Sequence, residues 1–308
     1  MHFRSVAAAF ALLFFAVMSV TAQTKTVAER LGYPANAKLL ILHADDLGVA
    51  RSVDAASFAA LDKKAVTSAS VMVPCPWLTE VAAYSKDHPD ADFGLHLTLT
   101  SEWKTYRWGS VEAKDNVLSL YDPDGYLWKD ATLAAGHIKP GEAEREIRAQ
   151  LERALSLDIR PTHLDSHMGT LFATPELFAV FAKVARDYKL PFLAVKVSDE
   201  RNKLLALLTE NDIVLDSLVM AAPAVRPEGW KEFYAQAIKN LKPGLTEMIV
   251  HLGYDDAELR AVMEEHPDYG AAWRQRDFDV VTSPDFKKLL DENRVILIGW
   301  KDLKKLVQ

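Results

Sequence analysis

The sequence predicts an α/β fold, and within that class a TIM-like (β/α) barrel that need not be regular and forms a single domain. Short apolar runs alternate along the chain with amphipathic stretches, which is the pattern of βαβ units and a mainly parallel sheet. The count of about eight such runs favours a closed or nearly closed barrel. The 308 residues contain no Gly/Ser-rich linker and no internal repeat that would divide them. An open doubly wound sheet is the alternative.

The expected strands are rich in branched and apolar residues and are short enough to be buried. They cover residues 38–44, 67–73, 93–99, 162–165, 192–197, 213–218, 247–251 and 295–298. Pro161 also favours an extended backbone at the start of the fourth strand.

The expected helices are the amphipathic segments between these strands. They cover residues 52–63, 78–87, 142–157, 175–188, 230–241 and 284–293. Asp54, Thr174 and Ser283 are candidate N-caps, because a side-chain oxygen at such a position can accept a hydrogen bond from the first helical turn.

One long connection, residues 101–140, interrupts this alternation. It follows the third expected strand, so in a barrel it would lie over the carboxyl-end face. It carries six aromatic residues: Trp103, Tyr106, Trp108, Tyr121, Tyr126 and Trp128. A connection of this length in a compact domain is usually functional.

The amino terminus predicts export. His2 and Arg4 precede an apolar run that ends in the small residues before Gln23, which is the pattern of a secretory signal peptide over 1–22 with cleavage after Ala22. An uncleaved membrane anchor is the alternative. Cleavage would leave 23–308 as a secreted or periplasmic domain with no membrane segment. Its one cysteine, Cys75, allows no intrachain disulfide and is expected to be buried and inert.

The charge of the chain argues against nucleic acid or an anionic membrane as its main partner. The formal net charge is −7, and we find no basic patch that would offset it.

Polar residues cluster where the expected strands end, which is where α/β folds place their active sites. They are Asp45, Asp46, His96, His163, Asp165, His167 and His251. Carboxylate oxygens and neutral imidazoles are ordinary ligands of a catalytic divalent ion. A second carboxylate beside such a ligand can take a proton from water, so adjacent acids have a use: one binds and the other accepts the proton.

Structural interpretations of the same residues compete with this one. Paired aspartates before a glycine are common in turns and helix caps, and a histidine inside an apolar run is often a hydrogen-bonded core residue. His163 is a candidate for such a structural role. The remaining histidines, His43, His88, His137 and His266, are expected to be surface or packing residues.

Five motifs in this order resemble those of the YdjC-like (ChbG/HpnK) carbohydrate deacetylase family, which is related to the polysaccharide deacetylases. They read LLILHADDLGVARSVDAA, FGLHLTLT, PTHLDSHMG, MIVHLGYDD and WRQRDFDVVTSPDFKKLL. The resemblance runs from about Lys38 to the carboxyl terminus. It implies a (β/α) barrel, a divalent metal ion, zinc or magnesium, and removal of N-acetyl groups from amino sugars or oligosaccharides.

Residue by residue, the resemblance implies that Asp46, His96 and His167 bind the metal. Asp45 would be the general base, although which of the two aspartates binds and which accepts the proton is left open. The resemblance further implies His251 as general acid or oxyanion partner, and Arg274 with Asp277 as a pair that orients the base. The chain departs from many family members at Met168–Thr170, so its contacts with substrate are expected to differ.

The function expected from these observations is that of a metal-dependent carbohydrate deacetylase acting on an N-acetylated sugar. The aromatic residues of 101–140 would then either stack on sugar rings or form a small core of their own. Three alternatives stand beside it: a glycosidase using Asp45 and Asp165, another metal-dependent esterase or amidohydrolase, and a non-catalytic exported glycan-binding protein. The sequence determines neither the glycan nor the oligomeric state.

Overall fold

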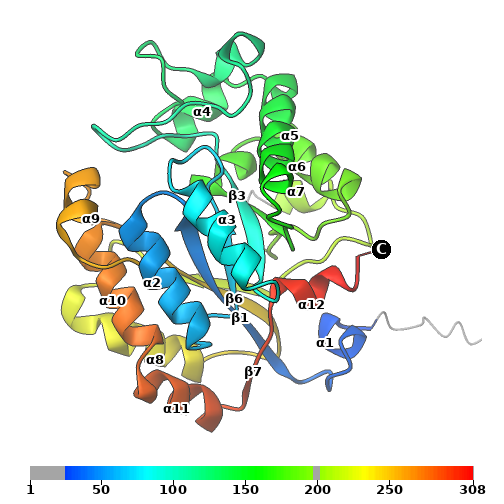
Figure 1. Cartoon of the computed structure of the whole chain (residues 1–308). Helices are drawn as coiled ribbons and strands as arrows, with labels where there is room; N and C mark the ends of the chain where they lie inside the picture. Colours follow the sequence, from blue (N-terminus) through cyan, green and yellow to red (C-terminus); the bar gives the residue numbers. More distant parts are fainter. Residues whose placement is uncertain (1–24, 197–201, 308) are drawn as a thin grey trace, which may run out of the picture.

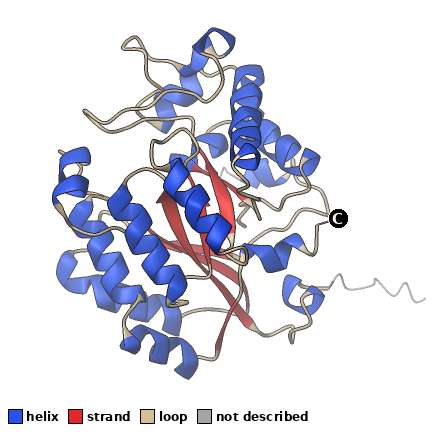
Figure 2. Cartoon of the chain, in the orientation of Figure 1, coloured by secondary structure: helices blue, strands red, loops and turns tan. Residues whose placement is uncertain are grey.

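The structure is a computed structural model that describes residues 25–196 and 202–307. A parallel sheet lies at its centre and helices surround it (Figures 1 and 2). The strands follow the order β4-β3-β2-β1-β6-β5, and β7 pairs with β1 beside β2. All of these pairs are parallel. The α/β class with a mainly parallel sheet, predicted from the sequence, is therefore confirmed.

The strands are β1 (Lys38–Leu47), β2 (Ser68–Val71), β3 (Phe93–Leu97), β4 (Leu164–Ser166), β5 (Ser217–Met220), β6 (Gly244–Val250) and β7 (Val295–Leu297). The α-helices are α1 (Val27–Arg30), α2 (Arg51–Asp62), α3 (Leu78–Asp87), α4 (Ala131–His137), α5 (Pro140–Ser156), α6 (Pro175–Asp187), α7 (Asn202–Leu205), α8 (Trp230–Lys239), α9 (Ala257–Val262), α10 (Ala271–Val281), α11 (Pro284–Glu292) and α12 (Trp300–Lys304). Short 3₁₀ turns are η1 (Lys114–Asn116), η2 (Leu118–Leu120), η3 (His167–Phe172) and η4 (Pro227–Gly229).

The sheet curves as a half-barrel and does not close, so the closed form of the predicted barrel is wrong. The expected strand 192–197 is absent from the described residues, and Val197 lies outside them. In its place, single parallel bridges join Leu164 to Phe192 and Val195 to Leu215. Through these bridges the segment 191–196 forms backbone hydrogen bonds with Leu164 of β4 and with Leu215 before β5, and the same segment lines the cavity described below.

Strand β1 organises the site because it is the longest strand and lies in the middle of the sheet. Its carboxyl-terminal part pairs with β2, its amino-terminal part with β7, and its other edge with β6. Every residue of β1 after Lys38 is buried. Strands buried on both faces read as continuous apolar runs, which is why 38–44 was recognisable from the sequence.

Helix boundaries follow local signals where these exist. The side chains of Thr174 and Ser283 cap α6 and α11, as predicted. Asp54 does not cap α2, which begins after Ala50; its carboxylate instead accepts a hydrogen bond of 2.6 Å from the backbone N–H of Gly48. Helix α10 was not predicted, because its apolar residues do not follow a clear helical period.

The predicted signal peptide, 1–22, lies outside the described residues, so export stays a prediction. Within the described part of the chain, no helix combines the length and the apolar character that crossing a membrane requires.

Candidate active site

Two adjacent carboxylates reach one site because the backbone of β1 bends between them. The register between β1 and β2 shifts between Ala44 and Leu47, and Asp46 has a left-handed backbone with φ of +69°. In an ideal strand Asp45 and Asp46 would point to opposite faces. A left-handed non-glycine residue is unfavourable and is typical of functional sites.

Asp46 lies together with His96 of β3 and His167 of η3, as the resemblance implied. Asp46 Oδ1 lies 3.3 Å from His96 Nε2 and 3.4 Å from His167 Nδ1. The three side chains are buried, and their donor atoms lie within 4.8 Å of one another. Asp46 Oδ1 is buried and has no hydrogen-bond partner. Oxygen and nitrogen donors of this kind, gathered around an unpaired oxygen, fit a divalent metal ion.

Each of the two histidines is held from behind by a second carboxylate. His96 Nδ1 lies 2.7 Å from Asp165 Oδ1, and His167 Nε2 lies 3.0 Å from Glu102 Oε2. Burial alone would lower the pKa of His167, but Glu102 and Asp46 raise it to about 9. The site therefore attracts positive charge. Carboxylate partners of this kind fix the ring orientation of metal-binding histidines.

Arg274 and Asp277, both on α10, do not form the ion pair expected from the sequence. Arg274 Nη2 donates to Asp46 Oδ2 at 2.7 Å, not to Asp45. Burial tends to raise the pKa of Asp46, but Arg274 and the two histidines hold it well below its usual value.

Asp277 instead supports the segment that carries His251. It accepts hydrogen bonds from Trp230 Nε1, Tyr234 Oη and the backbone N–H of His251, at 2.8, 2.7 and 3.0 Å. Asp277 therefore acts on the site through the position of His251.

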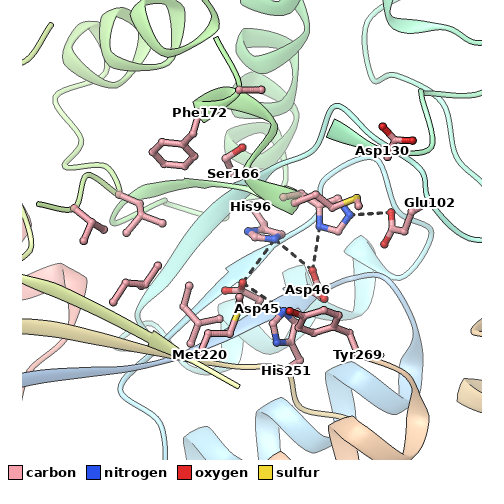
Figure 3. A pocket seen from close by; sticks show the side chains of 18 of the residues that line it. Asp45, Asp46, His96, Glu102, Asp130, Ser166, Phe172, Met220, His251 and Tyr269 are labelled. Carbon is pink, nitrogen blue, oxygen red and sulfur yellow. Dashed lines mark hydrogen bonds and ion pairs between the residues drawn. The ribbon is translucent and has the colours of Figure 1, made fainter. Parts of the chain in front are cut away.

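Asp45 and His251 face each other beside the Asp46 cluster (Figure 3). Asp45 Oδ2 lies 3.8 Å from His96 Nε2 and 4.0 Å from His251 Nε2. Burial is the main cause that lowers the pKa of His251 to about 4. Its imidazole is therefore neutral near pH 7 and able to accept a proton.

The imidazole of His43 contacts the carboxylate of Asp45, although the sequence suggested that His43 is a surface or packing residue. His43 is fully buried, and its Nε2 lies 3.0 Å from Asp45 Oδ1 and 3.1 Å from Asp165 Oδ2. Burial alone would lower the pKa of His43, but the hydrogen bonds to these two carboxylates and the charge of Glu247 raise it well above its usual value. His163 has the structural role considered above: it is fully buried and stacks on Trp300 with ring centroids 4.8 Å apart.

Glu102 and His43 are the site residues whose positions the sequence analysis did not predict. Asp165 was among the polar residues predicted at the strand ends, but its role as the partner of His96 was not predicted. Glu102 is identified only by its distance to His167, a residue far away in the sequence. His43 does carry a local signal that the sequence analysis did not use, because it precedes Asp45 by two residues and shares its face of β1.

The site opens into one cavity of about 1130 Å³. Figure 3 shows Glu102 and Asp130 on one side of Asp45 and Asp46, and Phe172 and Met220 on the other. The cavity is larger than most small-molecule sites, which measure about 300–1,000 Å³.

The aromatic residues of the segment 101–140 contribute little to this cavity, although Glu102, Lys129 and Asp130 of the same segment line it. Of its six aromatic residues, only Trp103 is among the described lining residues. Trp108 is buried against Trp103, with ring centroids 5.7 Å apart, and Trp128 stacks on His137 at 3.9 Å. The packing supports the small core of the two interpretations over sugar stacking by Trp108 and Trp128.

Comparison with known proteins places this site in a family. A family model described as YdjC-like protein matches residues 39–292. A carbohydrate deacetylase from Thermus thermophilus is 31% identical over 272 residues, which cover 86% of this chain and 93% of that protein. A chitooligosaccharide deacetylase from Serratia marcescens is 26% identical, with 86% and 99% covered.

A solved structure supports the fold. It belongs to an Enterococcus faecalis protein described as a candidate cellobiose-phosphate cleavage protein. Its TM-score is 0.75 at 24% identity, and the match covers 87% of this chain and 99% of that one.

Proposed function

This chain belongs to the YdjC-like family, and we propose that it is a metal-dependent carbohydrate deacetylase that removes N-acetyl groups from amino sugars. The observation that carries the proposal is the convergence of Asp46, His96 and His167 around the unpaired Asp46 Oδ1. The names of the relatives supply the reaction class, and the buried cluster supplies a place for the metal ion.

The proposed ligands are Asp46, His96 and His167. A divalent ion held there, zinc or magnesium, would polarise the amide carbonyl and lower the pKa of a water molecule. Asp165 and Glu102 fix the two imidazole rings, and Arg274 holds the second oxygen of Asp46. These contacts preorganise the donor atoms, which favours catalysis because little reorganisation is needed during the reaction.

Asp45 is the proposed general base and His251 the proposed general acid. Asp45 Oδ1 is held by His43, so Oδ2 is the oxygen that faces the reacting groups. His251 Nε2 lies 4.0 Å from Asp45 Oδ2, so it is placed to pass to the departing amine the proton that Asp45 takes from the attacking water. The products are acetate and a free amino sugar.

The glycosidase alternative finds less support. It needs two carboxylates on opposite sides of a glycosidic bond. Asp45 and Asp165 both bind the same nitrogen of His43, and Asp165 also binds His96. They are thus engaged with histidines on the inside of the sheet.

Acetate release from a panel of N-acetylated sugars and oligosaccharides tests the proposal, with and without a chelator and with divalent ions added back. We expect chelator-sensitive release. Asp46→Ala should lose both the metal and the activity, and Asp45→Asn should keep the metal and lose rate. Asp285→Asn, an exposed aspartate on α11, is the matched control. Near-normal turnover in Asp45→Asn would overturn the base assignment, and release of no acetate from any sugar with metal present would overturn the function.

We also propose that the enzyme acts outside the cytoplasm, on the basis of the signal peptide predicted over 1–22. Amino-terminal sequencing of the protein recovered from the periplasm or the medium should begin at Gln23. Full-length protein in the membrane fraction would indicate the uncleaved anchor instead.

A further inference from the structure

The cavity beside Asp46, His96 and His167 has a charged side and an apolar side. From this division we infer that the enzyme cleaves N-acyl groups longer than acetyl. The inference rests on the proposed function, since it specifies which acyl group the same site removes. Its basis is an apolar arm of the cavity that runs from Asp45 and His251 along β5, β6 and the bridging segment 191–196.

The apolar arm is defined by six side chains: Phe172, Leu193, Val195, Leu218, Met220 and Ile249. Leu218 and Met220 are each 38% exposed, although both stand on a strand of the central sheet. Large apolar side chains left open inside a cavity are typical of a binding site for an apolar group. Leu193 and Val195 belong to the segment that bridges β4 and Leu215, so the arm is lined by backbone-paired residues on both sides.

The arm extends from the catalytic groups toward the amino-terminal ends of β5 and β6. Leu218 and Met220 are in register with Glu247 and Ile249, which precede His251 on the β6 segment by four and two residues. Since a strand advances about 3.3 Å per residue, Leu218 lies about 13 Å from the level of His251 along the sheet. A methyl group would fill only the entrance of such an arm. The Lys196–Asp216 ion pair lines the cavity just before β5, where the apolar character ends.

On the opposite side of Asp46, His96 and His167, the cavity is lined by charged side chains that can bind a sugar. Glu102, Lys129 and Asp130 line the cavity there and offer charged groups to sugar hydroxyls. A sugar placed in the apolar arm would instead set hydroxyls against the six apolar side chains, which offer them no hydrogen bonds, and this is costly. With the scissile carbonyl at the Asp46 cluster, the amine-bearing sugar therefore points toward Asp130 and the acyl chain toward Met220 (Figure 3).

The reaction is the same hydrolysis with a longer acyl group. Water adds to the amide carbonyl carbon, the C–N bond breaks, and the amine nitrogen takes the proton. An N-acyl amino sugar and water thus give a fatty carboxylate and an ammonium sugar, with no further reactant.

A chain-length series tests the inference on the metal-loaded full-length enzyme. Glucosamine carrying N-acetyl, N-butanoyl, N-hexanoyl or N-octanoyl groups releases the same amine, so one amine assay gives kcat/KM for all four. We expect kcat/KM to rise about two- to fourfold for each added methylene that the arm buries. Values that stay flat or fall with chain length, with acetyl still cleaved, would overturn this inference and leave the deacetylase function in place.

Substitutions in the apolar arm test whether the preference for long acyl chains arises there. Leu218→Gln and Met220→Gln should each lower the ratio of octanoyl to acetyl kcat/KM by about tenfold, because a polar amide then contacts the acyl chain of the substrate. Leu118→Gln is the matched control, since Leu118 is 58% exposed on η2 and is not among the residues lining the cavity. A preference for long chains that both arm variants retain would refute the assignment to this arm. Absence of amine from every substrate would refute the proposed function itself.

Discussion

Replacement of Arg274 by methionine gives the sharpest test of where the metal ion sits. Arg274 and Asp46 are each about 3% exposed and are joined by a 2.7 Å hydrogen bond. Removing one partner of a buried ion pair typically costs about 3–5 kcal/mol, because the buried charge that remains loses its main counter-charge, which for Asp46 is Arg274. We therefore expect Arg274→Met to lower the free energy of unfolding of metal-free protein by about that amount.

A bound divalent ion would change this cost, because it supplies Asp46 with a new counter-charge. What then remains is the loss of the hydrogen bond from Arg274 Nε to the Tyr269 carbonyl and some packing, about 1–2 kcal/mol. The difference of about 2–3 kcal/mol must appear as tighter metal binding in the variant, by about 30- to 150-fold.

Denaturant titrations followed by tryptophan fluorescence, in chelator and at saturating metal, measure both unfolding free energies, and calorimetry measures the metal affinity directly. Arg260→Met is the control, because Arg260 forms an exposed, solvent-screened ion pair with Asp255 whose loss should change the unfolding free energy little, with or without metal. An equal loss of stability for Arg274→Met in both conditions, with unchanged metal affinity, would show that the ion does not bind at Asp46.

Two further predictions follow from contacts around the site. Glu102→Gln removes the charge behind His167 and should weaken metal binding by about tenfold, measured by calorimetry; unchanged affinity would argue against His167 as a ligand. Gly94→Ala places a methyl group 2.3 Å from the His163 ring and should lower the free energy of unfolding by about 1–3 kcal/mol. Gly136→Ala, in α4 with no atom within 4 Å of the new methyl, should instead be neutral or stabilising by up to about 1 kcal/mol, so equal effects in the two variants would contradict the packing argument.

Much of the fold could be predicted from the sequence because its signals are local. Strands buried on both faces read as apolar runs, and the capped amphipathic helices α6 and α11 begin where Thr174 and Ser283 indicate. Helix α10 lacked such a signal, since burial of Arg274 and Asp277 breaks the apolar pattern that identifies a helix. The missing strand at 192–195 had the composition of a strand but makes only single bridges to its neighbours.

The membership in the YdjC-like family, recognised from five motifs, is confirmed by the family model and the relatives. The sequence by itself also identified Asp45, Asp46, His96, His167 and His251 as candidates, because residues at strand ends are marked by the apolar runs before them. Only the tertiary structure decided the partners of Asp46 and His167, which are Arg274 and Glu102. The reason is physical. A strand end is a property of neighbouring residues, whereas a hydrogen bond between residues 65 or 228 positions apart depends on how the whole chain packs.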